Sequence, residues 1–168
     1  MIKIPEKEGR LSAAKAAHIE AVIAFVKRKT EGYRRDLFAN ISRVMLVSGT
    51  FEDMSARDDW SWLSDFILAD VKTLKQMIGR PELLQFDEFK RMYSDYFSAG
   101  SDKYVDASTK YNAYMFIENL GVTICPYCDE EYLDVVENGN GGKLRTLEID
   151  HFFPKGKYPA LAMCFYNL

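Results

Sequence analysis

The chain has 168 residues, a net charge of −3 and 48% hydrophobic residues, which is enough apolar material for a buried core and excludes a disordered protein. No apolar run approaches the roughly 20 residues that span a bilayer, and the N-terminus lacks a signal-peptide pattern. We therefore expect a cytoplasmic protein that does not bind membranes. Three cysteines, two of them in a Cys-x-x-Cys pair, favour metal or redox chemistry over a disulfide framework.

The charge is distributed unevenly along the chain. Residues 1–50 carry ten Lys and Arg against five Asp and Glu, whereas residues 51–168 carry twelve against twenty. The basic residues gather at Lys27-Arg28-Lys29 and at Arg34-Arg35. They form either a nucleic-acid-binding face or a solvated helix end, where cations are favourable near a C-terminus, and we favour the helix end.

Apolar side chains recur at helical spacing in five segments of the first 120 residues. Ile19, Val22, Ile23 and Val26 give the pattern in the first segment, where Ser12 is a suitable N-cap. The five predicted helices cover about residues 12–30, 37–48, 59–78, 81–99 and 107–120. Glycines or prolines separate most of them, and Gly121 ends the fifth.

Beyond Gly121 the pattern changes to short β-like runs. Residues 132–136 and 144–149 flank a glycine-rich loop and predict a hairpin. From Tyr158 onward we expect a helix to begin. The fold class predicted is mainly α with a small α+β module, in which a bundle of about five helices (residues 1–121) precedes a module of residues 122–168.

Cys125-Pro-Tyr-Cys128 has the spacing with which two thiolates bind one tetrahedral zinc ion. A closed structural site needs four ligands, and neither His151 nor Cys164 has a second partner at short spacing. Two alternatives remain open, a thioredoxin-like disulfide and a pair of buried cysteines without a ligand.

Asp150 and His151 follow one another at the end of an apolar run. The pair places a hard oxygen ligand beside a side chain that is a base at neutral pH, which is the minimum for metal-assisted phosphodiester hydrolysis. Adjacent residues of a strand point to opposite faces, so the strand must end here if both are to reach one phosphate. The other histidine, His18, lies in a helical stretch and is expected to be structural or exposed.

Four blocks of the C-terminal part together resemble the HNH endonucleases of the Cys-x-x-Cys type. They are Cys125–Cys128, Ile149–Lys155 (Ile-Asp-His-Phe-Phe-Pro-Lys), Tyr158–Leu161 (Tyr-Pro-Ala-Leu) and Asn167–Leu168. The resemblance spans roughly residues 122–168. It implies a ββα-metal fold, which agrees with the predicted hairpin and the helix after it.

Carried over by position, the resemblance implies a role for each matching residue. Asp150 is a ligand of a catalytic divalent cation such as Mg²⁺, His151 is the general base, and Asn167 orients the loop and the base. Cys125 and Cys128 are half of a structural zinc site. The second Cys-x-x-Cys pair and the remaining metal ligand of such families do not occur in the chain, so it is expected to be inactive by itself.

The predicted function is therefore metal-dependent hydrolysis of phosphodiester bonds in nucleic acid, with DNA as the expected partner. Lys155 and Lys157 either hold flanking phosphates or are ordinary loop cations. A helical lead before such a module also resembles the nuclease subunit of Septu-type antiphage defence systems, which implies an ATPase partner.

Two non-enzymatic functions compete with this prediction. In the first, a zinc-dependent module binds nucleic acid or protein, and Asp150-His151 only closes a turn. In the second, the helices present aromatic side chains as anchors for a protein partner. The aromatic residues concerned are Trp60, Trp62, Tyr93, Tyr96, Tyr111 and Tyr114. We favour a place in the core for them over a place at an interface.

Overall fold

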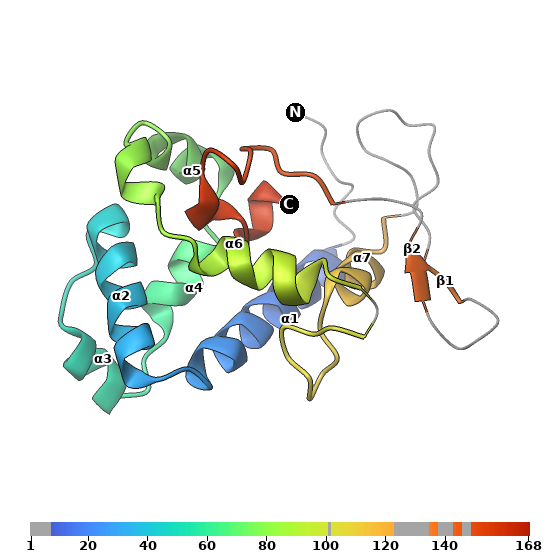
Figure 1. Cartoon of the computed structure of the whole chain (residues 1–168), viewed down its shortest axis with the longest axis horizontal. Coiled ribbons are helices and arrows are strands. Elements are labelled where there is room, and N and C mark those ends of the chain that lie inside the picture. The colour runs from blue at the N-terminus through green and yellow to red at the C-terminus, as the bar shows by residue number, and fades with distance from the viewer. Residues whose placement is uncertain (1–7, 101, 123–134, 138–142, 146–148) are drawn as a thin grey trace.

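The structure is a computed structural model that describes residues 8–100, 102–122, 135–137, 143–145 and 149–168 (Figure 1). It is mainly helical, which confirms the predicted fold class at this level. The α-helices are α1 (Glu8–Lys27), α2 (Glu31–Met45), α3 (Phe51–Ala56), α4 (Ser61–Ile67), α5 (Val71–Met77), α6 (Glu88–Met92) and α7 (Ala113–Leu120). The remaining elements are the 3₁₀ turns η1 (Pro81–Leu84), η3 (Pro159–Leu161) and η4 (Phe165–Asn167), the π-helix η2 (Tyr93–Phe97), and the strands β1 (Val135–Glu137) and β2 (Lys143–Arg145).

A side-chain cap decides where the first two helices meet. The hydroxyl of Thr30 accepts a hydrogen bond from the amide of Tyr33 at 3.3 Å and begins α2, so that α1 ends at Lys27. The first helix was predicted to continue to residue 30 and to end at Gly32. Gly32 lies inside α2 instead, because the Thr30 side chain caps the helix by accepting from the amide of Tyr33.

Two of the longer predicted helices are interrupted. The segment predicted as 59–78 divides into α4 and α5, because the carboxylate of Asp70 accepts from the amide of Thr73 at 2.7 Å and starts a new helix. The segment predicted as 81–99 divides into η1, α6 and η2. Helix α3 was not predicted. Thr50 is its N-cap, because the Thr50 hydroxyl accepts from the amide of Asp53.

The fifth predicted helix begins six residues later than expected. Asp106 binds the amide of Thr109 and the hydroxyls of Ser108 and Thr109 in a tight turn. Helix α7 therefore starts after Asn112, whose side chain accepts from two amides of the first turn. The predicted end is confirmed, since Gly121 closes α7 with a φ of 61°, a left-handed conformation that favours glycine.

The hairpin strands pair antiparallel, with Val136 opposite Leu144. The pairing agrees with the predicted hairpin where the two overlap, at residues 135–136 and 144–145, and the glycine-rich loop lies outside the described residues. The helix predicted to begin at Tyr158 is wrong over the described length. A 3₁₀ turn forms there, and Cys164 is then extended with ψ 126°. The chain bends back because the carbonyl of Asn167 accepts from the amide of Phe152 at 2.9 Å.

One apolar core joins the helices and the C-terminal segment. Helix α1 packs against α4 and α7, α2 packs against α4, and the C-terminal turns pack against α5 and α6 (Figure 1). The core extends from Ala14 of α1 to Phe165 of the C-terminal segment. Residues 149–168 are therefore held on the helices. The domain boundary at residue 121 remains a prediction.

Over the described residues, no helix combines the length and apolar character needed to cross a membrane.

Candidate active site

His151 lies at the surface of the core, with 8% of its area exposed. Its Nε2 is 3.1 Å from the carbonyl oxygen of Ala162. Because a carbonyl can only accept, Nε2 must carry the proton of the neutral ring, and Nδ1 then carries the lone pair. Within the described part of the chain no residue bonds to Nδ1. The ring is therefore held in the form that accepts a proton at Nδ1.

The surroundings of His151 favour the neutral imidazole. Burial lowers the pKa of His151 below its usual range, the carbonyl of Ala162 and the carboxylate of Asp150 act in the opposite direction, and Lys155 adds to the lowering. The net effect is a lower pKa. A histidine of this kind is unprotonated at pH 7 and is available as a base.

Asp150 is exposed, while the ring of the next residue, His151, turns inward. One carboxylate oxygen of Asp150 accepts from the amide of His151 at 2.8 Å. Residues 149–151 belong to no strand, so the condition that the extended run ends here is met. The carboxylate lies close enough to affect the ring, since Asp150 acts to raise the pKa of His151.

Asn167 ties the two halves of the segment together and is fully buried. Its Oδ1 accepts from the amide of Phe153 at 2.7 Å. Its Nδ2 donates to the carbonyl of Phe153 at 3.2 Å and to the carbonyl of Leu161 at 2.9 Å. Every hydrogen-bonding group of the amide is used. Asn167 thus fixes the loop after His151 and the turn that carries Ala162, while its role in orienting a base stays a prediction.

Tyr93, the first residue of the π-helix η2, supports His151 from the other side. The two rings meet edge to face, with centroids 4.5 Å apart. The Tyr93 hydroxyl donates to the carbonyl of Ile149 at 2.8 Å, so one side chain holds both the base and the backbone before it. From the sequence, Tyr93 was predicted only as a core aromatic or a partner anchor, because no sequence signal marks the π-helix. Such π segments are frequent at functional sites.

The two loop lysines take different positions. The ammonium of Lys155 lies 4.1 Å from the centre of the Tyr93 ring, and that of Lys157 lies 5.3 Å from the centre of the Tyr158 ring. Among the described residues neither lysine forms a salt bridge. Their role as phosphate contacts stays a prediction.

The predicted zinc ligands Cys125 and Cys128 lie outside the described residues, so their metal binding stays a prediction. Cys164 is fully buried and donates from Sγ to the carbonyl of Phe66 at 3.5 Å. Burial raises the pKa of the Cys164 thiol, which disfavours the thiolate that a metal needs. Within the described ranges, no three His, Cys, Asp or Glu side chains gather as a metal site.

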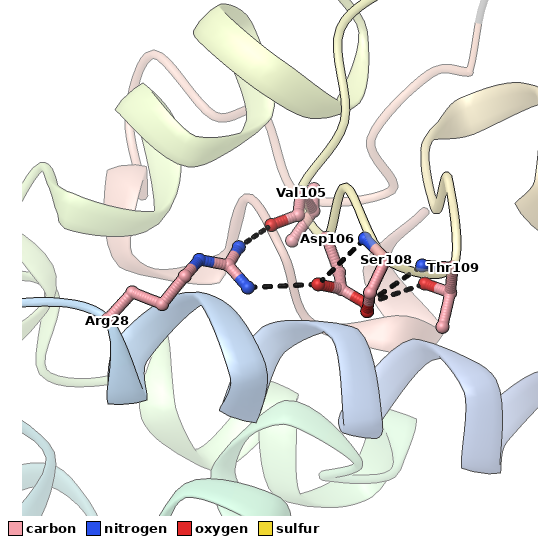
Figure 2. A network of polar contacts seen from close by, with 5 residues as sticks. All are labelled: Arg28, Val105, Asp106, Ser108 and Thr109. Carbon is pink, nitrogen blue, oxygen red and sulfur yellow. Dashed lines mark hydrogen bonds and ion pairs between the residues drawn. The ribbon is translucent and has the colours of Figure 1, made fainter.

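The basic cluster near the end of α1 is largely engaged in contacts within the chain. Arg28 donates to the carboxylate of Asp106 at 2.9 Å and to the carbonyl of Val105 at 2.7 Å, and Figure 2 shows this network reaching from α1 to the loop of residues 105–109. Lys27 pairs with Asp58 at 2.9 Å. Lys29 lies 4.1 Å from the ring centre of Phe25. These contacts agree with the preferred interpretation, a helix end.

The aromatic side chains proposed as partner anchors are mostly buried. Trp62, Tyr93, Tyr111 and Tyr114 belong to the buried set, and Tyr96 is the most exposed of the six at 37%. This distribution favours the core over an interface.

Together, the described C-terminal residues bring Asp150, His151, Asn167 and Lys155 into one region, held by Tyr93. No protein-family model, no curated protein and no solved structure matches the chain. A function for this region is therefore inferred from the motif residues and from the contacts that they make.

Proposed function

We propose that Asp150 and His151 are the metal ligand and the general base of an HNH-type endonuclease site. The observation that carries the proposal is the hydrogen bond from His151 Nε2 to the carbonyl of Ala162, beside an exposed carboxylate. This bond leaves Nδ1 as the proton acceptor.

In the proposed reaction His151 takes a proton from water at Nδ1 while the water oxygen forms a bond to phosphorus. The bond from phosphorus to the 3′-oxygen breaks, and the leaving oxygen takes a proton from solvent. The carbonyl of Ala162 and the carboxylate of Asp150 both favour the imidazolium that forms. The lowered pKa of His151 keeps the ring neutral before each turnover.

The chemistry of Asp150 fits a divalent cation such as Mg²⁺. Its carboxylate is exposed, and one oxygen is oriented by the amide of His151. Hard cations prefer such oxygen ligands. A bound cation would supply Lewis-acid stabilisation of the charge that develops on the phosphate. Cys125 and Cys128 would hold the structural zinc ion, as two thiolates of a tetrahedral site.

The proposed substrate is DNA. Lys155, close to His151 through Tyr93, and the exposed Lys157 are the proposed contacts to flanking phosphates. Cooperation with an ATPase in antiphage defence extends the proposal to the whole protein and depends on the resemblance alone. Co-purification with such an ATPase is its test.

The nuclease proposal is tested with plasmid nicking, in the presence of divalent cations, by a protein that includes the second Cys-x-x-Cys pair and the remaining metal ligand of the motif. We expect His151→Ala to reduce nicking at least a hundredfold, because general-base catalysis contributes about 10²–10⁴-fold, and Asp150→Ala to weaken the cation dependence. Asp95→Ala, at another exposed aspartate, is the control and should cleave normally. Unchanged nicking in both site variants would favour the non-enzymatic alternative, in which Asp150 only closes a turn.

A further inference from the structure

Three successive backbone carbonyls near the site each accept a hydrogen bond from a different buried side chain. The carbonyl of Leu161 accepts from Asn167 at 2.9 Å, that of Ala162 from His151 at 3.1 Å, and that of Met163 from His18 Nε2 at 2.8 Å. Asn167 and His151 belong to the motif. His18 comes from α1, 145 residues away from its acceptor.

The protonation of His18 follows from its two partners. The carbonyl of Met163 can only accept, so Nε2 of His18 must carry the proton. Nδ1 then accepts from the hydroxyl of Tyr111, which lies 2.9 Å away. Burial lowers the pKa of His18 to about 4, so this neutral form persists at pH 7. The direction of both bonds is therefore fixed, from Tyr111 through His18 to Met163.

His18 is a polar residue in an aromatic part of the core. It is fully buried, and its ring meets the edges or faces of Phe97, Phe116 and Phe165 with centroids 5.6–6.1 Å apart. An apolar side chain would fill this space without the cost of desolvating two ring nitrogens. The histidine is useful here because it makes two directed bonds, one of which holds the backbone next to the acceptor of His151.

We propose that His18, oriented by Tyr111, is a positioning residue that fixes the Ala162–Met163 backbone and thereby selects the tautomer of His151. Holding the Met163 carbonyl limits rotation of the adjoining peptide, whose carbonyl at Ala162 accepts from His151. The catalytic consequence of this arrangement rests on the proposed nuclease function. The arrangement itself does not.

The test uses nitrogen NMR of the full chain labelled with ¹⁵N-histidine. The chain has two histidines, and the signals that disappear in His18→Gln identify His18. In the unmodified protein we expect His151 to show a protonated Nε2 and an unprotonated Nδ1. His18→Phe keeps the aromatic packing and removes the bond to Met163, so the two ring-nitrogen shifts of His151 should move toward each other as the second tautomer becomes populated.

Two further variants make the outcome specific. His18→Gln retains a side-chain N–H donor and should preserve the His151 shifts. Phe38→Leu disturbs a buried ring that packs on Phe51 and Trp62 and should also preserve them. Tyr111→Phe removes only the hydroxyl, and we expect an intermediate change in His151. A folded His18→Phe or Tyr111→Phe protein with unchanged His151 shifts would overturn the proposal.

Nicking assays separate this proposal from the proposed function. We expect His18→Phe to lower kcat/KM about tenfold, the lower range for residues that orient a functional group from behind, and His18→Gln to restore most of it. If no variant or unmodified protein nicks DNA but the His151 shifts change as predicted, the positioning role stands and the nuclease function fails. If nicking depends on His151 but not on His18, the positioning role fails alone.

Discussion

Two polar networks hold loops against the helices, and they differ in whether any hydrogen-bonding group is left without a partner among the described residues. At the end of α1, Asp106 is buried and accepts from Arg28, Ser108 and Thr109 through both carboxylate oxygens (Figure 2). Near His151, the side-chain amide of Asn167 likewise uses both its oxygen and its nitrogen in hydrogen bonds to the backbone. However, Nδ1 of His151 has no bonding partner among the described residues, and the carboxylate of Asp150 is exposed.

The difference separates a structural network from the one that we propose to be reactive. A carboxylate that is saturated by donors gains stability and loses the capacity to bind a ligand, which makes Asp106 a poor base despite its burial. In the C-terminal segment the amide of Asn167 makes the structural hydrogen bonds. Nδ1 of His151 and the exposed carboxylate of Asp150 are thereby left open, as the proposed base and cation ligand require. The three predictions below test this division, in order of expected effect.

The largest effect is expected for Asn167→Asp. The buried amide donates to the carbonyls of Phe153 and Leu161, and a carboxylate in its place removes both donors and adds a charge. We expect a loss of about 4 kcal/mol in the free energy of unfolding. Denaturant unfolding measures it, and Asn40→Asp is the control, since the Asn40 side-chain oxygen only accepts, from Arg43. Equal stability of the two variants would contradict the structural role of the Asn167 hydrogen bonds to Phe153 and Leu161.

Asp106→Ala is expected to cost about 3 kcal/mol of stability, because the turn amide of Thr109 and two hydroxyls lose their acceptor. The control is Asp36→Ala, at an exposed aspartate inside α2, which should change stability by no more than about 0.5 kcal/mol. Thermal unfolding compares them. Nicking by folded Asp106→Ala should remain normal, and a specific loss of nicking would show that the Arg28 network belongs to the site.

The pH dependence of stability provides the third prediction. His18 has a pKa of about 4 in the folded chain, lowered from 6.5 by burial, so the unfolded chain binds the proton more tightly. The neutral, buried His18 contributes fully to the free energy of unfolding above pH 6.5, and this contribution is lost as the pH falls toward 4. Between pH 6 and pH 4.5 we expect a loss of about 2 kcal/mol.

In denaturant titrations, His18→Gln should abolish the loss of unfolding free energy that His18 causes between pH 6 and pH 4.5. His151, whose pKa is also lowered, contributes in the same direction in both proteins, so the difference between them isolates His18. Parallel stability curves for the two proteins would contradict the burial of a neutral His18.

The sequence predicted the mainly helical class well, because apolar spacing is a local property. Helix boundaries were less predictable, since capping competed with periodicity. Asp70 starts a new helix within a continuous apolar stripe, whereas Asp106 binds its own turn and does not begin α7. The C-terminal helix was predicted from Pro159 and good helix formers. A tertiary bond from Phe152 to Asn167 gave 3₁₀ turns instead.

The candidate site could be proposed from the sequence where its residues are adjacent, as in Asp150-His151, and their catalytic roles stay a prediction. The acceptor of His151 was not, because a backbone carbonyl at Ala162 has no sequence signature. His18 did carry a signal. It shares the apolar spacing of Ala14, Val22 and Phe25 on α1, and a polar residue on a buried stripe requires bonding partners. Those partners, Tyr111 and Met163, are distant in sequence and appear only in the folded chain.

The most direct test of the central claim, that Asp150 places a cation beside the base His151, is a titration of the ¹⁵N-histidine-labelled chain with Mn²⁺. A paramagnetic cation at Asp150 should broaden the ring signals of His151 at lower concentrations than those of His18, which is an internal reference in the same spectrum. Asp150→Asn should remove that difference. Equal broadening of both histidines, or selective broadening that survives Asp150→Asn, would contradict the account.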